Sequence, residues 1–455
     1  MLRTLVNVRW AALAAAFALG ACSGGAPSLP GPSAVDAVRH VHRNTSSGKI
    51  QHVIIIVQEN RSFNNLFYGF PGAKTAKFGY NSSNQKITLQ PVGLETSWDL
   101  DHSSTSFFAA CNGTGSYPGT DCQMNGFNNE SVGCGHRYQP QCPNANPPYS
   151  YVPHTETKPY FQLGKEYVLA DQMYASNFDA SSFISHQYII GAQANSAVNY
   201  PDSWWGCPGG SGDMVDTVNS QRQIGNPVTA CWDSQTLGDE LDNASIPWAF
   251  YTSTYNGDGG IWSAYQAISH IYNGQDWKND IITPQTTFFS DISNGKLRPM
   301  SWITPTCENS DHAGCSSKTG PSWVASLVNA VGESQYWNNT AIFVFWDDYG
   351  GWYDPEPPTM LDYDGLGLRI PMLVISPYAK KHHVSHVPYE HGSILRWIEN
   401  LWGLGQLAAS DTRATPPDDA FDFNQAPRKF KQVKSDYSIQ YFMHQKPDTR
   451  IPDSE

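Results

Sequence analysis

The stretch that decides the fold is FVFWDDYGGWYDPEPP, residues 343–358. It begins with an apolar run, as in a buried strand, which leads directly into the carboxylates of Asp347 and Asp348 and then into a pair of glycines. Burying a charge is costly unless a partner accompanies it. A core strand that ends on two carboxylates therefore indicates a site for a cation or for a reaction at that end.

Several other stretches share this pattern of a short apolar run that ends in polar residues. Runs that are apolar on both faces are typical of central strands covered by helices. Strands that alternate with helices predict an α/β fold with a mostly parallel central sheet and helices on both faces. The expected strands are VIIIVQEN (53–60), EYVLADQ (166–172), IPWAFYTS (246–253), PMSWITPT (299–306), AIFVFWDD (341–348) and IPMLVISP (370–377), and the expected helices include SFISHQYIIGAQ (182–193), SWVASLVNAV (322–331) and HGSILRWIENLWGL (391–404).

The net charge of the chain limits the kinds of ligand or macromolecule that it can be expected to bind. The 455 residues carry a formal net charge of -13, from 28 basic and 41 acidic side chains, and contain no long basic run. This composition argues against a nucleic-acid-binding face and makes a divalent cation a better partner than a polyanion. The sequence implies no protein partner.

The N-terminus is typical of a targeting signal. Arg3 and Arg9 supply positive charge around the apolar run WAALAAAFALG (10–20), which is too short to span a membrane. The run leads to Leu-Gly-Ala-Cys at residues 19–22, which resembles the bacterial lipobox. An ordinary secretory signal followed by an incidental cysteine is the alternative interpretation.

The lipobox defines the expected domain organisation. We expect residues 1–21 to be a lipoprotein signal peptide and Cys22 to carry a lipid that anchors the exported protein to a bacterial membrane, facing the periplasm or the cell exterior. Residues 22–48, rich in Gly, Ser and Pro, are predicted to be a flexible tether. Residues 49–455 then form a single domain with loop insertions.

The remaining eight cysteines are an even number in an oxidising compartment, which favours disulfides. Zinc is a weaker alternative because no CxxC or Cys-His cluster appears. The loops at 100–160 and 200–235, rich in Gly, Asn, Pro and Cys, are predicted to be disulfide-tied insertions that shape the mouth of a site. The near-neighbour pairs are Cys111 with Cys122, Cys134 with Cys142, Cys207 with Cys231, and Cys307 with Cys315.

A second pair of polar residues follows the first predicted strand. Glu59 and Asn60 come just after its apolar run, in the same kind of position as Asp347 and Asp348. Ligands bind beyond the carboxyl ends of the strands in such sheets. Three carboxylates packed together repel one another unless they are protonated or bound to a metal, so a divalent ion is expected there.

Six short motifs follow one another along the chain: ENRSF (59–63), DLDH (99–102), MNGF (124–127), Asp311-His312, DDYGGWYD (347–354) and EHGSILRWIE (390–399). In this order they resemble the phosphoesterase family, over roughly residues 50–402. That family includes bacterial phospholipases C and related acid phosphatases and belongs to the alkaline phosphatase superfamily. The resemblance implies an alkaline-phosphatase-like three-layer sandwich.

The resemblance also implies one divalent metal ion and a nucleophilic hydroxyl. The metal ligands carried over are Glu59, Asn60, Asp347 and Asp348, and Ca, Mg or Mn is favoured over Zn by the oxygen-rich set. Counting back from Tyr188 places the nucleophile at Ser182, in the stretch NFDASSFISHQY, and leaves Ser181 as the alternative. A helix N-terminus and a metal both favour an alkoxide and an incoming phosphate.

Three histidines match motif positions and are expected to bind phosphate oxygens or to protonate the leaving group. They are His102, His312 and His391. His186, four residues past Ser182, is a further candidate for substrate binding, or else it faces the core. The histidines of KKHHVSHV (380–387) are expected to lie in a solvated loop.

The implied activity is a metal-dependent phosphoric ester hydrolase that works through a covalent phosphoserine. The double Asp at 347 and 348, and Pro355 where phospholipases C carry a histidine, favour a phosphomonoesterase over a phospholipase C. Asn64 also departs from the Asp of many relatives. The alternatives are a phospholipase C that cleaves phospholipid headgroups and an inactive, lipid-anchored protein that binds phosphate ligands.

Overall fold

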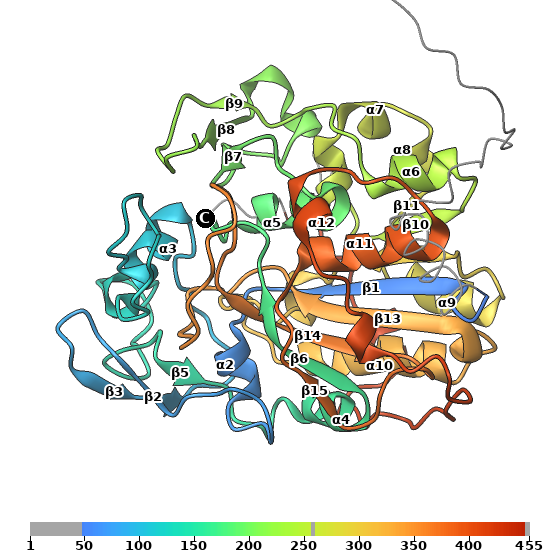
Figure 1. The fold of residues 1–455 in the computed structure, drawn as a ribbon, viewed down its shortest axis with the longest axis horizontal. Helices are drawn as coiled ribbons and strands as arrows, with labels where there is room; N and C mark the ends of the chain where they lie inside the picture. Colours follow the sequence, from blue (N-terminus) through green and yellow to red (C-terminus); the bar gives the residue numbers. More distant parts are fainter. Residues whose placement is uncertain (1–47, 256–259, 451–455) are drawn as a thin grey trace, which may run out of the picture. The chain divides into compact units, whose positions relative to one another are not determined.

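The apolar runs assemble into one large sheet in the computed structural model, which describes residues 48–255 and 260–450 (Figure 1). The signal peptide, Cys22 and nearly all of the tether lie outside the described residues. All six predicted strands belong to this sheet, which has nine strands within the described ranges. They are β1 (His52–Gln58), β6 (Val168–Tyr174), β10 (Trp248–Tyr251), β11 (Ile281–Ile282), β12 (Met300–Ile303), β13 (Thr340–Trp346), β14 (Arg369–Ile375), β15 (His383–Ser385) and β16 (Tyr389–Glu390).

The sheet is mostly parallel, as predicted. Its order is β11-β10-β12-β1-β13-β14-β6-β15, and β16 also pairs with β6. Only β14 runs against the others, because its pairs with β13 and β6 are antiparallel while the remaining pairs are parallel. The α/β class and the mostly parallel sheet are therefore confirmed.

Helices cover both faces of the sheet. The strands β1 and β13 are buried along almost their whole length, which requires cover on each side. On one side α11 packs with α5 and α12, and on the other α10 packs with α4 and α9. The helices are α2 (Phe63–Phe67), α3 (Ser104–Cys111), α4 (Lys158–Glu166), α5 (Ser182–Gly191), α6 (Leu237–Asn243), α7 (Ser269–Tyr272), α8 (Asp276–Asn279), α9 (Thr287–Ser293), α10 (Gly320–Gly332), α11 (His391–Trp402), α12 (Ala409–Arg413) and α13 (Ile439–Met443).

The pairing of β1 with β13 positions the site. The two strands lie side by side and parallel, in a register that places Gln58 opposite Trp346 (Figure 1). The residues that follow each strand, Glu59 and Asp347, therefore emerge next to each other at the same edge of the sheet. These strand ends are 288 residues apart in the chain, so only the sheet brings them together.

The predicted loop insertions carry short elements and are tied by disulfides. All four near-neighbour cysteine pairs are bonded, which confirms the disulfide prediction. Among the described residues, no helix has both the length and the apolar character needed to cross a membrane. The short strands are β2 (Phe78–Tyr80), β3 (Lys86–Thr88), β4 (Gln90–Pro91), β5 (Ser150–Tyr151), β7 (Ala197–Val198), β8 (Met214–Thr217) and β9 (Val228–Thr229).

Candidate active site

The carboxyl ends of β1 and β13 and the N-terminus of α5 meet in one buried cluster of oxygen atoms. The backbone N–H of Asn60 donates to Asp347 Oδ1 at 3.1 Å. Ser182 Oγ, on the first residue of α5, lies 3.3 Å from Asn60 Oδ1 and 3.4 Å from Asp348 Oδ2. Glu59 belongs to the same cluster, and all of these side chains are fully buried.

Local backbone geometry allows this close approach. Asn60 has a left-handed backbone with φ of 56°, a conformation that asparagine tolerates better than most residues. Gly350, in the turn after the acidic pair, has φ of 59°, and a Cβ atom there would lie 2.1 Å from the carbonyl oxygen of Asn60. The glycine is therefore required for the acidic turn to pass the Asn60 backbone, while its N–H donates to Asp348 Oδ1 at 2.7 Å.

The side-chain amide of Asn60 lies between the carboxylates and two histidines. One end of the amide is 3.1 Å from Asp347 Oδ1 and 3.2 Å from Glu59 Oε2, and the other end is 2.8 Å from Nε2 of His102 and 3.0 Å from Nε2 of His312. With its oxygen and nitrogen exchanged the amide hydrogen-bonds to both carboxylates, so its orientation carries no argument for a cation. The three buried carboxylates of Glu59, Asp347 and Asp348 are the donor set that fits a divalent metal ion.

His186 joins this cluster from one turn along α5. Its Nε2 lies 3.0 Å from Glu59 Oε1 and 3.7 Å from Asp347 Oδ2. One ligand atom from each of Glu59, His186 and Asp347 lies within 4.8 Å of the others. Burial, opposed by the charge of Asp347, lowers the pKa of His186 to about 4, so the ring is neutral at pH 7 and available as a ligand. Sequence reasoning proposed a substrate contact for His186, whereas its position favours a metal contact.

The pKa values of Asp347 and Asp348 are shifted in opposite directions. Burial and the adjacent Asp347 carboxylate raise the pKa of Asp348 well above its usual value. For Asp347, burial acts in the same direction but is outweighed by His186 and by hydrogen bonds, so its pKa is lowered. A bound cation removes this conflict, because it stabilises the ionised form of both groups.

His102 and His312 lie on the other side of Asn60 from the carboxylates. His102 Nδ1 donates to the carbonyl of Leu100 at 2.7 Å, and His312 Nδ1 donates to the carbonyl of Ala313. Since a carbonyl can only accept, each Nδ1 carries a hydrogen and each Nε2 is an acceptor in the neutral ring. Each Nε2 lies next to the side-chain amide of Asn60.

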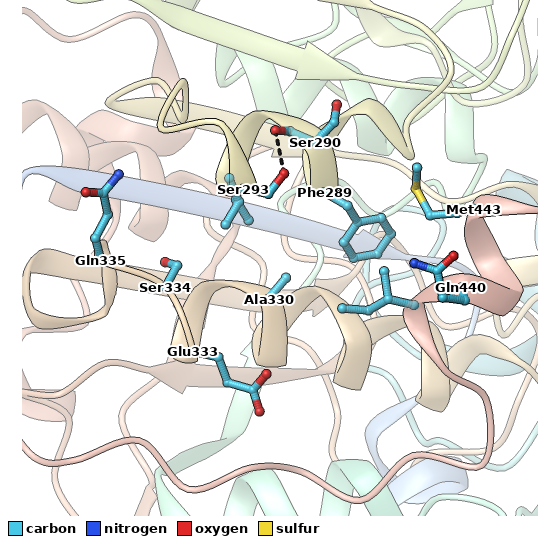
Figure 2. A pocket seen from close by; sticks show the side chains of 11 residues that line it. Phe289, Ser290, Ser293, Ala330, Glu333, Ser334, Gln335, Gln440 and Met443 are labelled. Carbon is cyan, nitrogen blue, oxygen red and sulfur yellow. Dashed lines mark hydrogen bonds between the residues drawn. The ribbon is translucent and has the colours of Figure 1, made fainter.

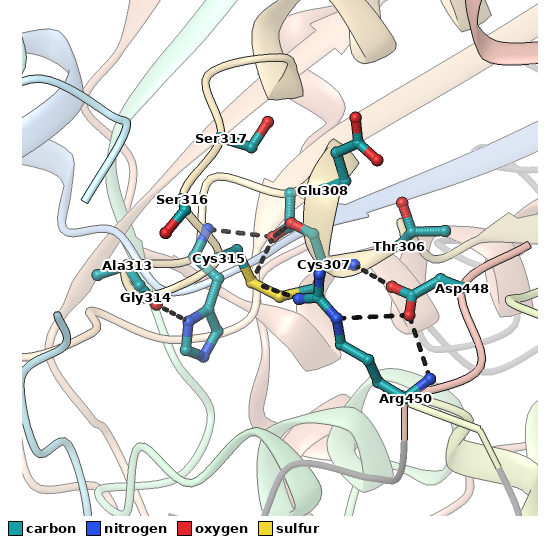
Figure 3. The surroundings of a disulfide bond; sticks show 12 residues. Thr306, Cys307, Glu308, Ala313, Gly314, Cys315, Ser316, Ser317, Asp448 and Arg450 are labelled. Atoms are coloured by element: carbon teal, nitrogen blue, oxygen red, sulfur yellow. Dashed lines mark hydrogen bonds and ion pairs between the residues drawn. A yellow bond between two sulfur atoms is a disulfide. The ribbon is translucent and has the colours of Figure 1, made fainter. Parts of the chain in front are cut away.

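A disulfide closes the loop that carries His312. Cys307 and Cys315 are bonded, and Asp448 and Arg450 from the C-terminal segment lie beside them (Figure 3). The Cys307 N–H donates to Asp448 Oδ2 at 3.0 Å. The ring of His312 also stacks on Trp262 with a centroid distance of 5.7 Å, so the imidazole is held from several directions.

His391 is less directly placed than the other motif histidines. It begins α11, is buried, and its Nε2 lies 3.4 Å from the carbonyl of Trp346, next to Asp347. Burial lowers the pKa of His391 to about 4 despite the Trp346 carbonyl and Asp347. It therefore lies beside the end of β13 as a neutral ring.

Geometry favours Ser182 over Ser181. Ser181 Oγ donates to Asp179 Oδ1 at 2.9 Å and so takes part in the turn before α5. Ser182 Oγ points instead to the oxygen cluster. The histidines of the 380–387 loop are elsewhere, because His383 pairs with Asp419 at 3.2 Å and His386 with Asp171 at 2.9 Å.

Two functional neighbours were missed from the sequence. Asp99 Oδ2 lies 3.3 Å from His312 Nδ1, and Tyr200 Oη lies 3.0 Å from His102 Nε2. The DLDH motif contains Asp99, so its carboxylate was a signal that could have been used. Tyr200 lies in a loop without periodicity or motif, and nothing in the sequence marks it.

A separate groove lies away from these residues. It has a volume of about 700 Å³ and runs between α9, α10 and α13 (Figure 2). Its lining includes Phe289, Glu333 and Met443 but none of the predicted site residues. Its size alone assigns it no function.

The sequence of the chain matches the phosphoesterase family over residues 50–405, a range that contains every element of the site. The chain belongs to the phosphoesterase family. This finding confirms the family resemblance that the ordered motifs indicate. It supports a hydrolase that acts on phosphoester bonds.

Individual relatives agree with this assignment. The chain is similar to phospholipase C B of Mycobacterium tuberculosis, with 22% identity over 402 residues that cover 78% of this chain and 74% of the relative. It is also similar to the non-hemolytic phospholipase C of Pseudomonas aeruginosa, with 25% identity over 428 residues that cover 82% of this chain and 57% of that relative. Among solved structures, it is similar to an alkaline phosphatase superfamily protein from Vibrio parahaemolyticus, with a TM-score of 0.37, 11% identity, and coverage of 86% of this chain and 81% of that one.

Proposed function

We propose that this protein hydrolyses phosphoric esters with one divalent metal ion and a covalent phosphoserine at Ser182. The observation that carries the proposal is the convergence of Ser182 Oγ on Asn60 Oδ1 at 3.3 Å and Asp348 Oδ2 at 3.4 Å. A hydroxyl at a helix N-terminus, beside oxygens arranged for a cation, is suited to attack phosphorus.

The cation would be held by Glu59, Asn60, Asp347 and Asp348, with His186 adjoining them. When bound, a divalent ion lowers the free energy of negative charge on the serine oxygen and on the phosphoryl group. Its identity stays open among Ca, Mg, Mn and Zn. The imidazole of His186 fits Mn or Zn better than Ca or Mg, whereas the carboxylates fit Ca, Mg and Mn.

The chain supplies the remaining chemistry. Ser182 Oγ forms a bond to phosphorus, its hydrogen passes to the Asp348 carboxylate that it already contacts, and the bond from phosphorus to the ester oxygen breaks. His102 or His312, when its ring carries a proton on Nε2 as well as on Nδ1, binds the phosphoryl oxygens or donates the Nε2 proton to the leaving oxygen. Water then adds to phosphorus and passes one hydrogen back to that ring, the bond to Ser182 Oγ breaks, and the hydrogen held by Asp348 returns to the serine as phosphate is released.

We favour small phosphomonoesters as substrates, because of the double Asp and of Pro355. A monoester dianion needs more positive charge than a diester, and burial keeps His186 and His391 neutral. That charge would come from the metal. Phospholipid headgroups are the second candidate substrate, favoured by the names of the relatives. Turnover of p-nitrophenyl phosphate and of phosphatidylcholine, at one metal concentration and pH, separates the two.

We also propose that the protein is exported and anchored by a lipid on Cys22, as the lipobox-like sequence indicates. Metabolic labelling with a fatty acid is expected to label the wild-type protein. The Cys22→Ala variant is expected to lose the label and to leave the membrane fraction, and labelling that persists in this variant would contradict the anchor.

Serine substitution tests the phosphoserine proposal. We expect Ser182→Ala to lower turnover by about 10³-fold or more while the melting temperature changes little. Ser181→Ala is the matched control, since its hydroxyl contacts Asp179 instead of the cluster, and it is expected to keep most activity. Substantial turnover by Ser182→Ala would reject the role of Ser182, and loss of turnover only in Ser181→Ala would transfer it.

A further inference from the structure

Tyr200 places a hydroxyl next to the nucleophile that the reaction described above does not use. The backbone N–H of Ser182 donates to Tyr200 Oη at 3.1 Å. The same oxygen lies 3.0 Å from Nε2 of His102. Tyr200 therefore bridges the N-terminus of α5 and a histidine predicted to contact phosphate.

The loop that carries Tyr200 is fixed to both neighbours. Asn199 donates its backbone N–H to Asp179 Oδ2 at 2.6 Å, and the other oxygen of Asp179 accepts from Ser181 Oγ at 2.9 Å. Asn199 Oδ1 accepts from the backbone N–H and the hydroxyl of Ser104, at 3.2 and 2.7 Å. Since Ser104 follows His102 by two residues, Asp179 and Asn199 hold the tyrosine at a set position relative to both the serine and the histidine.

The directions of these hydrogen bonds are determined by their partners. The Ser182 N–H can only donate, so Tyr200 Oη accepts from it. Because His102 Nδ1 donates to the carbonyl of Leu100, a neutral ring accepts at Nε2, where the hydroxyl of Tyr200 donates to it beside the Asn60 amide at 2.8 Å. The hydroxyl of Tyr200 thus accepts a hydrogen bond from the Ser182 N–H and donates one to His102.

We propose that Tyr200 is a further catalytic residue, whose hydroxyl donates a hydrogen bond to a phosphoryl oxygen of the substrate. This inference rests on the proposed function. Phosphorus bonded to Ser182 Oγ carries its other oxygens within reach of the Ser182 N–H, which is the group that Tyr200 Oη now contacts. On substrate binding the O–H of Tyr200 turns from His102 to one of those oxygens, while the N–H of Ser182, which is fixed in the helix, stays bonded to Tyr200 Oη. Rotation of the hydroxyl about its C–O bond is sufficient for Tyr200.

The surroundings make such a donor effective. Tyr200 is partly buried, and its ring lies 6.5 Å from that of Trp205 and 6.3 Å from that of His102, measured between centroids. Hydrogen bonds to developing negative charge are stronger where water is excluded, and removal of one such donor typically costs about 10²-fold or more in turnover. A neutral donor adds no charge to a site that already requires a cation.

The test compares two tyrosine substitutions in the metal-loaded full-length protein. Tyr200→Phe removes the hydroxyl at the site, and Tyr363→Phe is the matched control, because its hydroxyl contacts Ser196 at 2.7 Å near the start of the same loop. We expect Tyr200→Phe to lower kcat/KM for p-nitrophenyl phosphate by about 10²-fold and to weaken inhibition by orthovanadate by a similar factor. Tyr363→Phe is expected to stay within about twofold of wild type on both measurements.

A variant that retains a donor gives a second measurement. Tyr200→His keeps a hydrogen-bond donor on a smaller ring and is expected to recover part of the activity lost in Tyr200→Phe. If Tyr200→Phe does not fold, Tyr200→His is compared with Tyr200→Leu, and the same recovery is expected. Equal losses in the donor and non-donor variants would overturn the proposal, because ring packing alone would then explain them.

Two other results would also overturn it. Unchanged kcat/KM and vanadate affinity in Tyr200→Phe would show that the hydroxyl does not contact the phosphoryl group. Tighter vanadate binding would show that the hydroxyl obstructs the Ser182 N–H. The failures are distinguishable: turnover that survives Ser182→Ala rejects the proposed function, whereas an inactive Ser182→Ala beside an unaffected Tyr200→Phe rejects only the role of Tyr200.

Discussion

Asp347 and Asp354 stand seven positions apart in the same segment, and both are fully buried, yet their oxygens face opposite surroundings. The carboxylate of Asp354 is matched by the guanidinium of Arg369, with Nε at 2.9 Å and Nη2 at 3.1 Å. The backbone N–H of Asn64 adds a third bond to Asp354, at 3.0 Å. Asp347 accepts the backbone N–H of Asn60 at 3.1 Å, but no arginine or lysine pairs with it among the described residues, and it lies beside the carboxylate of Asp348.

The difference separates a structural carboxylate from a functional one. The chain itself neutralises Asp354, and this pair ties the segment after β13 to β14. The cluster around Asp347 contains more acceptors than donors, which a folded chain retains only where a cation completes it. The pair also bears on Pro355, which directly follows Asp354. Because Arg369 binds Asp354, the turn at these two residues has a structural role in this chain.

The largest expected effect comes from removing the cation. Treatment with a chelator is expected to abolish almost all phosphoesterase activity, a loss of about 10³-fold or more, because the serine and the phosphoryl group lose their main charge partner. The loss is measured as turnover of p-nitrophenyl phosphate before and after re-addition of Mn, Mg, Ca or Zn. Full activity after exhaustive chelation, with metal content verified as zero, would contradict the metal site.

Breaking the structural pair comes next. Arg369→Met leaves Asp354 buried without its partner and is expected to lower the free energy of unfolding by about 3–5 kcal/mol, since an uncompensated buried charge remains. Denaturant unfolding measures the change. The double variant Asp354→Leu/Arg369→Met is the control and should recover much of the loss. If Arg369→Met is as stable as wild type, Arg369 is not what neutralises the buried carboxylate of Asp354, and the contrast with the Asp347 cluster fails.

Removing a carboxylate from the acidic pair, Asp347 and Asp348, should raise the free energy of unfolding instead of lowering it. In metal-free protein, Asp348→Asn removes a carboxylate whose pKa is raised by burial and by Asp347, and it is expected to increase the free energy of unfolding by about 1 kcal/mol. The same variant is expected to be inactive when metal is added. Thermal unfolding in the presence of chelator measures the gain, and a destabilised variant would indicate that Asp348 is already neutralised within the protein.

Glu399 offers the smallest effect and a third way to bury a carboxylate. Burial, with Asp411 next in importance, raises its pKa from 4.5 to about 10, and neither of its oxygens accepts a hydrogen bond within the described residues. The folded state then binds more protons than the unfolded state between these pKa values, so stability falls as pH rises through that window. Arg396 Nη1, 3.9 Å away, offsets part of the charge that forms.

Glu399→Gln removes this titration. Between pH 6 and pH 9 we expect wild type to lose about 1 kcal/mol more of its free energy of unfolding per pH unit than Glu399→Gln does. Denaturant unfolding at several pH values measures both slopes. Parallel slopes would show that Glu399 is ionised in the folded state, as the carboxylates of the metal cluster are when a cation is bound.

Sequence patterns predict much of this architecture because they record local physics. The apolar runs and their polar ends locate β1 and β13, and the even number of closely spaced cysteines favours disulfides, although the sequence leaves their connectivity open. The reversed direction of β14 is not visible in its apolar run, because a buried strand has the same pattern in either direction. The bond of Arg369 to Asp354 and the approach of Tyr200 to Ser182 depend on contacts between distant segments, which no local pattern records.

The strand β1 pairs only with strands that are synthesised much later, which has a consequence for the nascent chain. Its neighbours in the sheet are β12 and β13, so this strand of isoleucines and valines waits for almost 250 residues before β12 is made and for almost 290 before β13 is made. At about 5–20 residues per second, the shorter interval is roughly 12–50 s on the ribosome. An apolar segment exposed for so long is prone to aggregate, and a chaperone that covers residues 53–57 as they emerge would be needed to keep the nascent chain competent to fold.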